Sequence, residues 1–172
     1  MRIKSAWILL LVLPISSWAA NVQEFKLDNG LKLIVQEDHR SPVVVSQVWY
    51  KAGSLDEVNG KTGVAHVLEH MMFKGTKKVK AGQFSRLIAA AGGKENAFTS
   101  SDYTCYFQQL EKSNLALAFE LEADRMANLQ LTKEEFDKEI KVVMEERRWR
   151  TDDKPQSLVN EAFQGAVYRA HP

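Results

Sequence analysis

Short apolar runs separated by turn residues occupy the first half of the chain. The runs 25–28 and 31–36 flank Asn29-Gly30, and this dipeptide between two apolar runs is typical of a β-hairpin. Residues 43–50 (VVVSQVWY) are β-branched and aromatic, which predicts a strand in the centre of a sheet. The pattern predicts two further strands, joined through a short polar turn: 95–100 and 103–110.

Apolar residues recur at a spacing of three or four in several other segments, which predicts helices. Thr62 is placed to cap the first helix, and Gly92-Gly93 is placed to end the second. Thr132 and Glu135 form a capping box at the start of a later helix. The predicted helices are 64–72, 83–91, 113–128, 133–150 and a last segment that begins at Pro155.

The order of these elements indicates the fold class. Strands precede helices, and the hairpins make the sheet mainly antiparallel. We therefore expect an α+β fold, with a mainly antiparallel sheet and helices packed on one of its faces. The chain stops at His171-Pro172 with no helix cap or stop signal, so we expect the domain to be incomplete at its C-terminus.

The first 19 residues form a separate segment. A basic start precedes an apolar run, Ala6–Pro14, and the small residues Ser17 and Ala19 occupy the −3 and −1 positions of a cleavage site. This pattern predicts a secretory signal peptide over residues 1–19 and leaves residues 20–172 as one domain. The alternative is a membrane anchor, but the run is about half of the ~20 residues that span a bilayer.

Charge and cysteine content narrow the function classes. Residues 20–172 contain 21 Lys and Arg against 22 Asp and Glu, so their net charge is near −1. We therefore expect no nucleic-acid partner, and no stable membrane anchor after the signal is removed. The single Cys105 lies in an alternating segment between Tyr103 and Phe107, which favours a buried apolar role. A secreted chain without disulfides is ordinary in a bacterial periplasm.

The clearest chemical signal is the segment from His66 to His70, which reads H-x-x-E-H. On a helix, His66, Glu69 and His70 project from one face. Imidazole is the commonest metal ligand among side chains, and this motif is the reverse of the H-E-x-x-H order found in many metal sites. The motif predicts a metal site, whereas the alternative is two core histidines on a buried helix.

A catalytic centre of this kind needs a third protein ligand. Cys105 is one candidate, and a carboxylate from the predicted helix 133–150 is another. Glu139 and Glu146 share one stripe of that helix, and spacing prefers Glu146 over its neighbour Glu145 only modestly. Glu69 adjoins His70 and is better placed to accept a proton from water than to bind the metal.

Six segments resemble one family of enzymes, the M16 zinc peptidases (pitrilysin, insulysin and the mitochondrial processing peptidase). Within it, the chain is most similar to the N-terminal part of bacterial members related to the processing peptidase beta subunit. The matching segments are LDNGL (27–31), YKAGS (50–54), GVAHVLEHMMFKGT (63–76), GGKENAFT (92–99), EADRM (122–126) and EIKVVMEER (139–147). The resemblance extends over roughly residues 23–172.

The resemblance implies a zinc metalloendopeptidase with one Zn²⁺ per chain. In the family, the third ligand is a Glu about 76 residues after the second His, and another Glu precedes it by seven residues. These positions are Glu146 and Glu139 here. The implied zinc ligands are His66, His70 and Glu146, with Glu69 as general base and Glu139 as a supporting catalytic carboxylate behind the ligands.

The family also binds an extended peptide along an exposed edge strand at an N-A-x-T segment. Asn96, Ala97, Phe98 and Thr99 match that segment and are the implied substrate-binding residues. Complete members carry a second, homologous domain, in the same chain or in a partner subunit, that helps to bind the substrate carbonyl. We therefore expect a peptidase of the bacterial periplasm that acts with such a domain; the alternative is a non-catalytic fragment or subunit that binds peptide or a partner.

Overall fold

The computed structural model describes residues 22–168, which fall into two compact units divided between Ser41 and Pro42. The predicted signal segment, residues 1–19, lies outside the described residues. In the described part, no helix combines the length and the apolar character that a bilayer-spanning segment needs.

The first unit is the predicted hairpin. Strand β1 (Val22–Lys26) pairs antiparallel with β2 (Lys32–Gln36). Between them, the backbone N–H of Leu27 donates to the carbonyl of Leu31 at 2.8 Å, and Gly30 adopts a φ of +88°. Because glycine reaches positive φ without steric cost, Asn29-Gly30 produces the turn that the sequence predicts.

The second unit contains an antiparallel sheet of three strands in the order β3-β5-β4. These strands are β3 (Val43–Tyr50), β4 (Lys94–Thr99) and β5 (Thr104–Glu111). The prediction of residues 43–50 as a central strand is therefore wrong within the described residues, because β5 lies in the middle and β3 at an edge. A β-branched, aromatic run marks a strand that packs well on one face, and it carries no information on which strands flank it.

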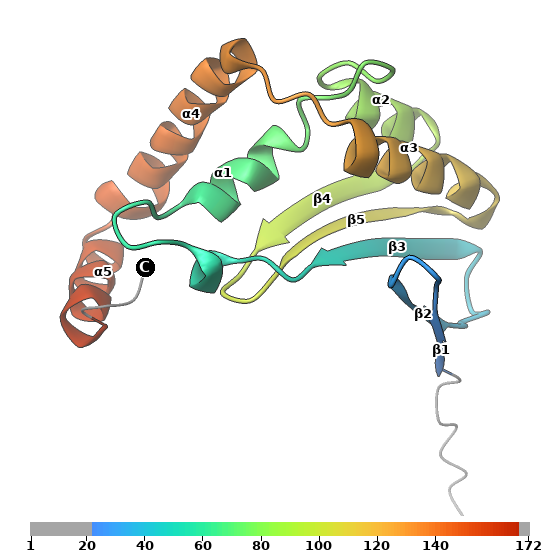
Figure 1. The fold of residues 1–172 in the computed structure, drawn as a ribbon, viewed down its shortest axis with the longest axis horizontal. Helices are drawn as coiled ribbons and strands as arrows, with labels where there is room; N and C mark the ends of the chain where they lie inside the picture. Colours follow the sequence, from blue (N-terminus) through green and yellow to red (C-terminus); the bar gives the residue numbers. More distant parts are fainter. Residues whose placement is uncertain (1–21, 169–172) are drawn as a thin grey trace, which may run out of the picture. The chain divides into compact units, whose positions relative to one another are not determined.

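Five α-helices are described, and Figure 1 shows α1, α2 and α3 on one face of the sheet. This arrangement confirms the α+β fold class, with an antiparallel sheet and helices on one face. Short 3₁₀ turns at Ser54–Asp56 (η1) and Lys112–Asn114 (η2) and a π-helix at Arg148–Asp152 (η3) complete the second unit. The helices are α1 (Val64–Met71), α2 (Gln83–Ala90), α3 (Leu115–Asn128), α4 (Lys133–Arg147) and α5 (Pro155–Val167).

One of the two helix caps predicted by hydroxyl residues is present in the structure. Thr132 caps α4, since its hydroxyl accepts a hydrogen bond from the backbone N–H of Glu135 at 3.2 Å. Thr62 does not cap α1, contrary to the prediction. The carboxylate of Glu57 instead accepts from the N–H groups of Gly63 (2.8 Å) and Ala65 (2.7 Å). A carboxylate at a helix N-terminus accepts from these N–H groups, and its negative charge also interacts favourably with the helix dipole. Glu57 therefore caps α1 in place of the hydroxyl of Thr62.

The core lies between the sheet and helices α2 and α3. Its centre is a cluster of buried apolar side chains: Phe84, Ile88, Leu110, Ala118 and Leu121. Beside it, the buried guanidinium of Arg125 forms an ion pair with Glu122 and lies over the rings of Phe84 and Tyr106, 4.5 Å from each centroid. Pairing and stacking offset the cost of burying this charge, and the stacking on Tyr106 connects α3 to β5 of the sheet.

Candidate metal centre

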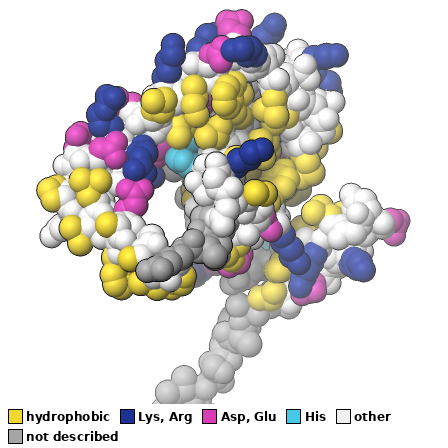
Figure 2. Space-filling view, turned by 60° about the vertical axis from the view of Figure 1, so that its left-hand side comes forward, with side chains coloured by type: hydrophobic (Ala, Val, Ile, Leu, Met, Phe, Trp, Pro, Cys, Tyr) yellow, Lys and Arg dark blue, Asp and Glu magenta, His cyan; other side chains and the backbone are white. Residues whose placement is uncertain are grey.

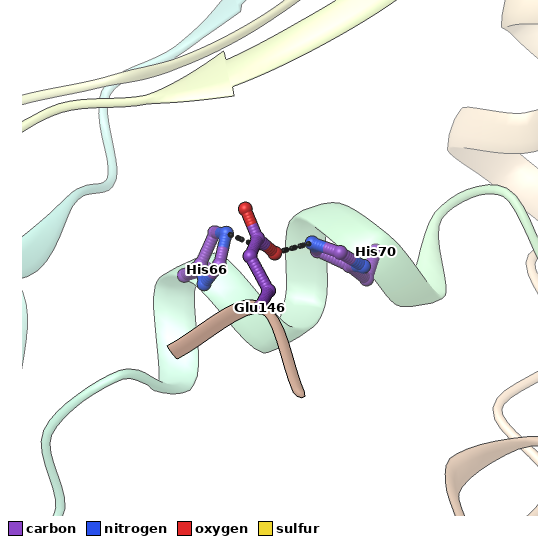
Figure 3. A group of neighbouring side chains, drawn as sticks. All are labelled: His66, His70 and Glu146. Atoms are coloured by element: carbon purple, nitrogen blue, oxygen red, sulfur yellow. Dashed lines mark ion pairs between the residues drawn. The ribbon is translucent and has the colours of Figure 1, made fainter. Parts of the chain in front are cut away.

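Three side chains from two helices converge at one point. His66 and His70 project from the same side of α1, and Glu146 reaches them from α4 (Figure 3). The Oε2 atom of Glu146 lies 3.6 Å from Nε2 of His66 and 3.2 Å from Nε2 of His70. One donor atom from each residue lies within 4.8 Å of the other two.

The donor types, and the separations of Glu146 from the two histidines, fit a tetrahedral zinc ion. Zinc takes His nitrogen and carboxylate oxygen at about 2.0–2.2 Å, which puts two donors of a tetrahedral site about 3.3–3.5 Å apart. The two contacts of Glu146 bracket this value. Half-burial of the three side chains leaves a side open to solvent, which a catalytic site needs for water or substrate.

Behind His70, Glu139 fixes the orientation of the imidazole. Its Oε1 atom lies 2.9 Å from Nδ1 of His70, so a proton on Nδ1 leaves the lone pair of Nε2 directed at Glu146. The other oxygen of Glu139 forms an ion pair with Lys74. Burial raises the pKa of Glu139, but the hydrogen bonds with Lys74 and His70 together lower it more, so its pKa lies below the usual range. Glu139 is therefore charged at neutral pH.

Glu146 is held from its other side by Arg150. Nη1 of Arg150 lies 2.8 Å from Oε1 of Glu146, and Oε2 remains directed at the histidines. Arg150 belongs to the π-helix η3, which directly follows α4. Glu145, in contrast, is exposed and pairs with Arg148 at 2.6 Å. The geometry thus brings Glu146, and not Glu145, to the histidines.

Glu69 lies on the same helix but is not a member of the donor group. Its Oε2 atom accepts a hydrogen bond of 2.5 Å from the hydroxyl of Thr99 at the end of β4. Glu69 is half-buried, one residue before His70, and a carboxylate at this position can exchange a proton with a water molecule beside the donor group.

The predicted substrate-binding segment, residues 96–99, forms the last four of the six residues of β4. Within the described residues, β4 is an edge strand, because it pairs with β5 along one side and with no strand along the other. The side chain of Thr99 faces α1, since its hydroxyl bonds Glu69 of that helix, and Ala97 shares this face because side chains alternate along a strand. Asn96 and Phe98 face the opposite side.

Cys105 and His39 are not members of this donor group. Cys105 is fully buried in β5 as a free thiol, opposite Trp49 and Phe98, and it is not a member of the donor group. The expectation of a buried apolar role for Cys105 is confirmed. His39 pairs with Glu37 in the first unit at 3.3 Å. His171 lies outside the described residues.

Three contacts of the centre escaped the sequence reasoning: Lys74 on Glu139, Thr99 on Glu69 and Arg150 on Glu146. Lys74 follows His70 by four residues, and this spacing is a signal that could have placed it near the ligands. Arg150 likewise follows Glu146 by four residues. The contact of Thr99 with Glu69 depends on strand β4 packing against α1, and no local sequence pattern predicts it.

The surface around the centre carries both hydrophobic and charged side chains. Figure 2 shows a histidine at the surface, with hydrophobic side chains on one side of it and charged side chains on the other. A groove of about 330 Å³ runs between α1 and the start of α4. It is lined mainly by apolar side chains: Val64, Val67, Leu68, Met71, Leu131, Thr132, Lys133 and Phe136.

Comparisons with known proteins identify the family of this chain. Residues 32–172 match the sequence model of the insulinase family, peptidase family M16. The chain is 41% identical over 157 residues to the zinc protease PqqE of Helicobacter pylori, an alignment that covers 91% of this chain and 35% of that protein. It is 36% identical over 157 residues to the uncharacterized zinc protease ML0855 of Mycobacterium leprae, covering 90% of this chain and 34% of that protein. The chain thus spans about a third of the length of these curated relatives.

Solved structures give the same result. The crystal structure of a protease from Helicobacter pylori matches with a TM-score of 0.78 and 43% identity, over 81% of this chain and 34% of that one. The periplasmic protease PqqL from Escherichia coli matches with a TM-score of 0.75 and 29% identity, over 86% of this chain and 18% of that one. The sequence match, the fold and relatives named as zinc proteases agree, and this chain belongs to the insulinase family, peptidase family M16.

Proposed function

We propose that this chain carries the zinc centre and one substrate strand of a metallopeptidase that hydrolyses bonds in extended peptides. One observation carries the proposal: donor atoms of His66, His70 and Glu146, from two helices far apart in sequence, lie within 4.8 Å of one another. The zinc protease names of the relatives support zinc as the ion.

In this proposal, His66, His70 and Glu146 hold the ion, and Glu139 keeps the imidazole of His70 in the orientation that binding requires. Bound zinc would supply Lewis-acid polarisation of water and of the peptide carbonyl. Glu69 accepts the proton of the attacking water and returns it to the amine that leaves. Its half-buried position beside the donor group suits both steps.

Strand β4 binds the substrate backbone. An edge strand presents unpaired N–H and C=O groups, and an extended peptide can add to it as a further strand. Backbone pairing of this kind tolerates many side chains. Alternate residues of Asn96, Ala97, Phe98 and Thr99 turn their N–H and C=O groups to the free edge, so the segment would contribute mainly through main-chain atoms of these alternate residues, and we expect broad sequence tolerance.

A second, homologous domain completes the active enzyme in this proposal, whether it lies in the same chain or in a partner subunit. The solved relatives include the first half of the protease PqqL, which matches this chain with a TM-score of 0.76. Hydrolysis needs a held peptide and a stabilised carbonyl oxygen in addition to an activated water. Residues 20–172 alone should therefore be a poor peptidase even with zinc bound, and adding the second half should restore turnover.

We also propose that the chain is exported to the periplasm and loses residues 1–19. The small residues at Ser17 and Ala19 motivate this site, and the relative PqqL is titled a periplasmic protease. N-terminal sequencing of the exported protein should begin at Ala20. A mature chain that still begins at Met1 would contradict the proposal.

Three matched Glu→Gln variants of the complete protein test the function. Glu146→Gln should lose bound zinc, whereas Glu145→Gln should keep it, because Glu146 faces the histidines and Glu145 pairs with Arg148 instead. Glu69→Gln should keep zinc and lower turnover of an unstructured peptide by at least ~10²-fold, the scale of general-base catalysis. Zinc loss in Glu145→Gln alone, or near-normal turnover in Glu69→Gln, would refute the assignment. A zinc-loaded complete protein with no turnover of any peptide would favour a binding role instead.

A further inference from the structure

The contact between Thr99 and Glu69 joins the substrate strand to the motif helix. Thr99 is the last residue of β4, and Glu69 lies near the end of α1. The Thr99 hydroxyl donates a hydrogen bond of 2.5 Å to Oε2 of Glu69. Both side chains are half-buried, so water competes with this bond less than it would at the surface.

The Thr99 hydroxyl is itself held in place from β5. Thr104 is its register partner, and the two hydroxyl oxygens lie 3.3 Å apart. Thr104 donates its single proton to the carbonyl of Ala52 at 2.9 Å. The proton of Thr99 therefore remains for Glu69, and the Thr99 oxygen is confined between a buried strand and the carboxylate.

The alternation of β4 gives Thr99 a role different from that of its neighbours. Its side chain faces α1, whereas the side chain of Phe98 faces the other side of the sheet. A peptide that pairs with β4 would use the main chain of Thr99 and leave its hydroxyl on Glu69. The strand that binds the peptide backbone is then also the strand that fixes the carboxylate.

We propose that Thr99 is a positioning residue that holds the carboxylate of Glu69 in one rotamer, with Oε1 left for the attacking water. This inference rests on the proposed role of Glu69 as general base. A glutamate side chain has three rotatable bonds, and a reacting group displaced by about 1 Å can lose up to ~10²-fold in rate. A single charge-assisted hydrogen bond on one oxygen restricts this motion.

Kinetics of the zinc-loaded complete protein test the proposal. Thr99→Val keeps the branched shape but removes the hydroxyl, and it should lower kcat about tenfold or more while KM stays within twofold. Thr99→Ser keeps the hydroxyl and should restore kcat to within about threefold of the wild type. In a Glu69→Gln background, Thr99→Val should have little further effect, because the two residues act as one unit.

A crystal structure of metal-free Thr99→Val provides a readout that is independent of turnover. Glu69 should occupy more than one rotamer in that variant and a single rotamer in Thr99→Ser. If the valine variant folds poorly, Thr99→Ala removes the same hydroxyl and is measured in the same way.

The outcomes separate this inference from the proposed function. Unchanged kcat in Thr99→Val, or a raised KM with unchanged kcat, would overturn the positioning role, and the second result would make Thr99 a substrate-binding side chain. An unchanged Glu69 rotamer in the valine variant would also overturn it. If Glu69→Gln itself retains full turnover, the general-base proposal fails, whatever Thr99 does.

Discussion

The carboxylate of Glu139 touches no predicted zinc donor atom, yet its charge should set the zinc affinity. Glu139→Gln preserves the size of the side chain and one acceptor oxygen at 2.9 Å from Nδ1 of His70. It replaces a charge-assisted hydrogen bond with a neutral one. Bonds to charged groups contribute about 1.5–3 kcal/mol and neutral ones about 0.5–1.5 kcal/mol, so the loss is about 1–1.5 kcal/mol.

The variant also leaves Lys74 without its carboxylate. The side chain of Lys74 is 22% exposed, and an unpaired cation so close to His70 repels a bound metal ion. We therefore expect zinc affinity to fall by about 10–100-fold, the range typical of groups that orient metal ligands. Replacing Lys74 as well, in Glu139→Gln/Lys74→Met, should recover part of the lost affinity.

Competition with a chromogenic chelator measures these zinc affinities directly. Glu145→Gln is the matched control, because it makes the same change on the same helix at an exposed carboxylate that pairs with Arg148. Its zinc affinity should stay within twofold of the wild type. If Glu139→Gln also binds zinc within twofold, or if the control loses as much affinity, the argument from the charge of Glu139 is wrong.

Three other outcomes follow from the structure. Burial raises the pKa of the Cys105 thiol from 9.0 to about 11, so the folded chain keeps a proton that the unfolded chain releases. Its contribution to stability is complete below pH 9 and is lost as pH rises toward 11. Burial also raises the pKa of Tyr50 and Tyr106, which both forms share, so urea unfolding across this window should show a smaller loss of stability in Cys105→Ala than in the wild type; equal losses would contradict the effect of the buried thiol. A Cβ at Gly53 would lie 2.4 Å from the carbonyl oxygens of Ser100 and Ser101, so Gly53→Ala should lower the free energy of unfolding by about 1–3 kcal/mol. An unchanged melting temperature would contradict this close approach of the backbone to Gly53. The side chain of Arg150 is 62% exposed, so solvent partly screens its ion pair with Glu146, and Arg150→Gln should weaken zinc binding by only about two- to fivefold. Arg148→Gln, which alters the pair with Glu145, is the control. A loss of zinc affinity beyond about 20-fold in Arg150→Gln would assign Arg150 a larger role.

Local signals predicted the elements because each depends on residues close together in the chain. Asn29-Gly30 specified a turn through the positive φ of Gly30, and Thr132 specified the start of α4 through one hydrogen bond. The spacing of His66 and His70 placed both rings on one side of a helix. Glu146 needed the family resemblance, since its spacing on the helix preferred it to Glu145 only modestly.

The wrong predictions and most of the missed contacts involve segments that are separated in the sequence. The N-terminus of α1 is capped by Glu57, from across a loop, because a carboxylate there satisfies two backbone donors at once. The sequence could not order the strands, because pairing of β3 with β5 depends on how α1, α2 and β4 fold back between them. For the same reason, nothing in the motif itself predicts the hydroxyl of Thr99 on Glu69.

The order of the strands in space has a consequence for synthesis of the chain. β3 ends at Tyr50, and its partner β5 is complete only at Glu111, which is 61 residues later. A ribosome that adds about 5–20 residues per second needs roughly 3–12 s for that stretch. Throughout this interval the run VVVSQVWY is an unpaired apolar strand, which can pair with another nascent chain. Yield in a host cell should therefore depend on how fast residues 51–111 are translated, and on chaperones that cover β3 meanwhile, more than on the stability of the finished fold.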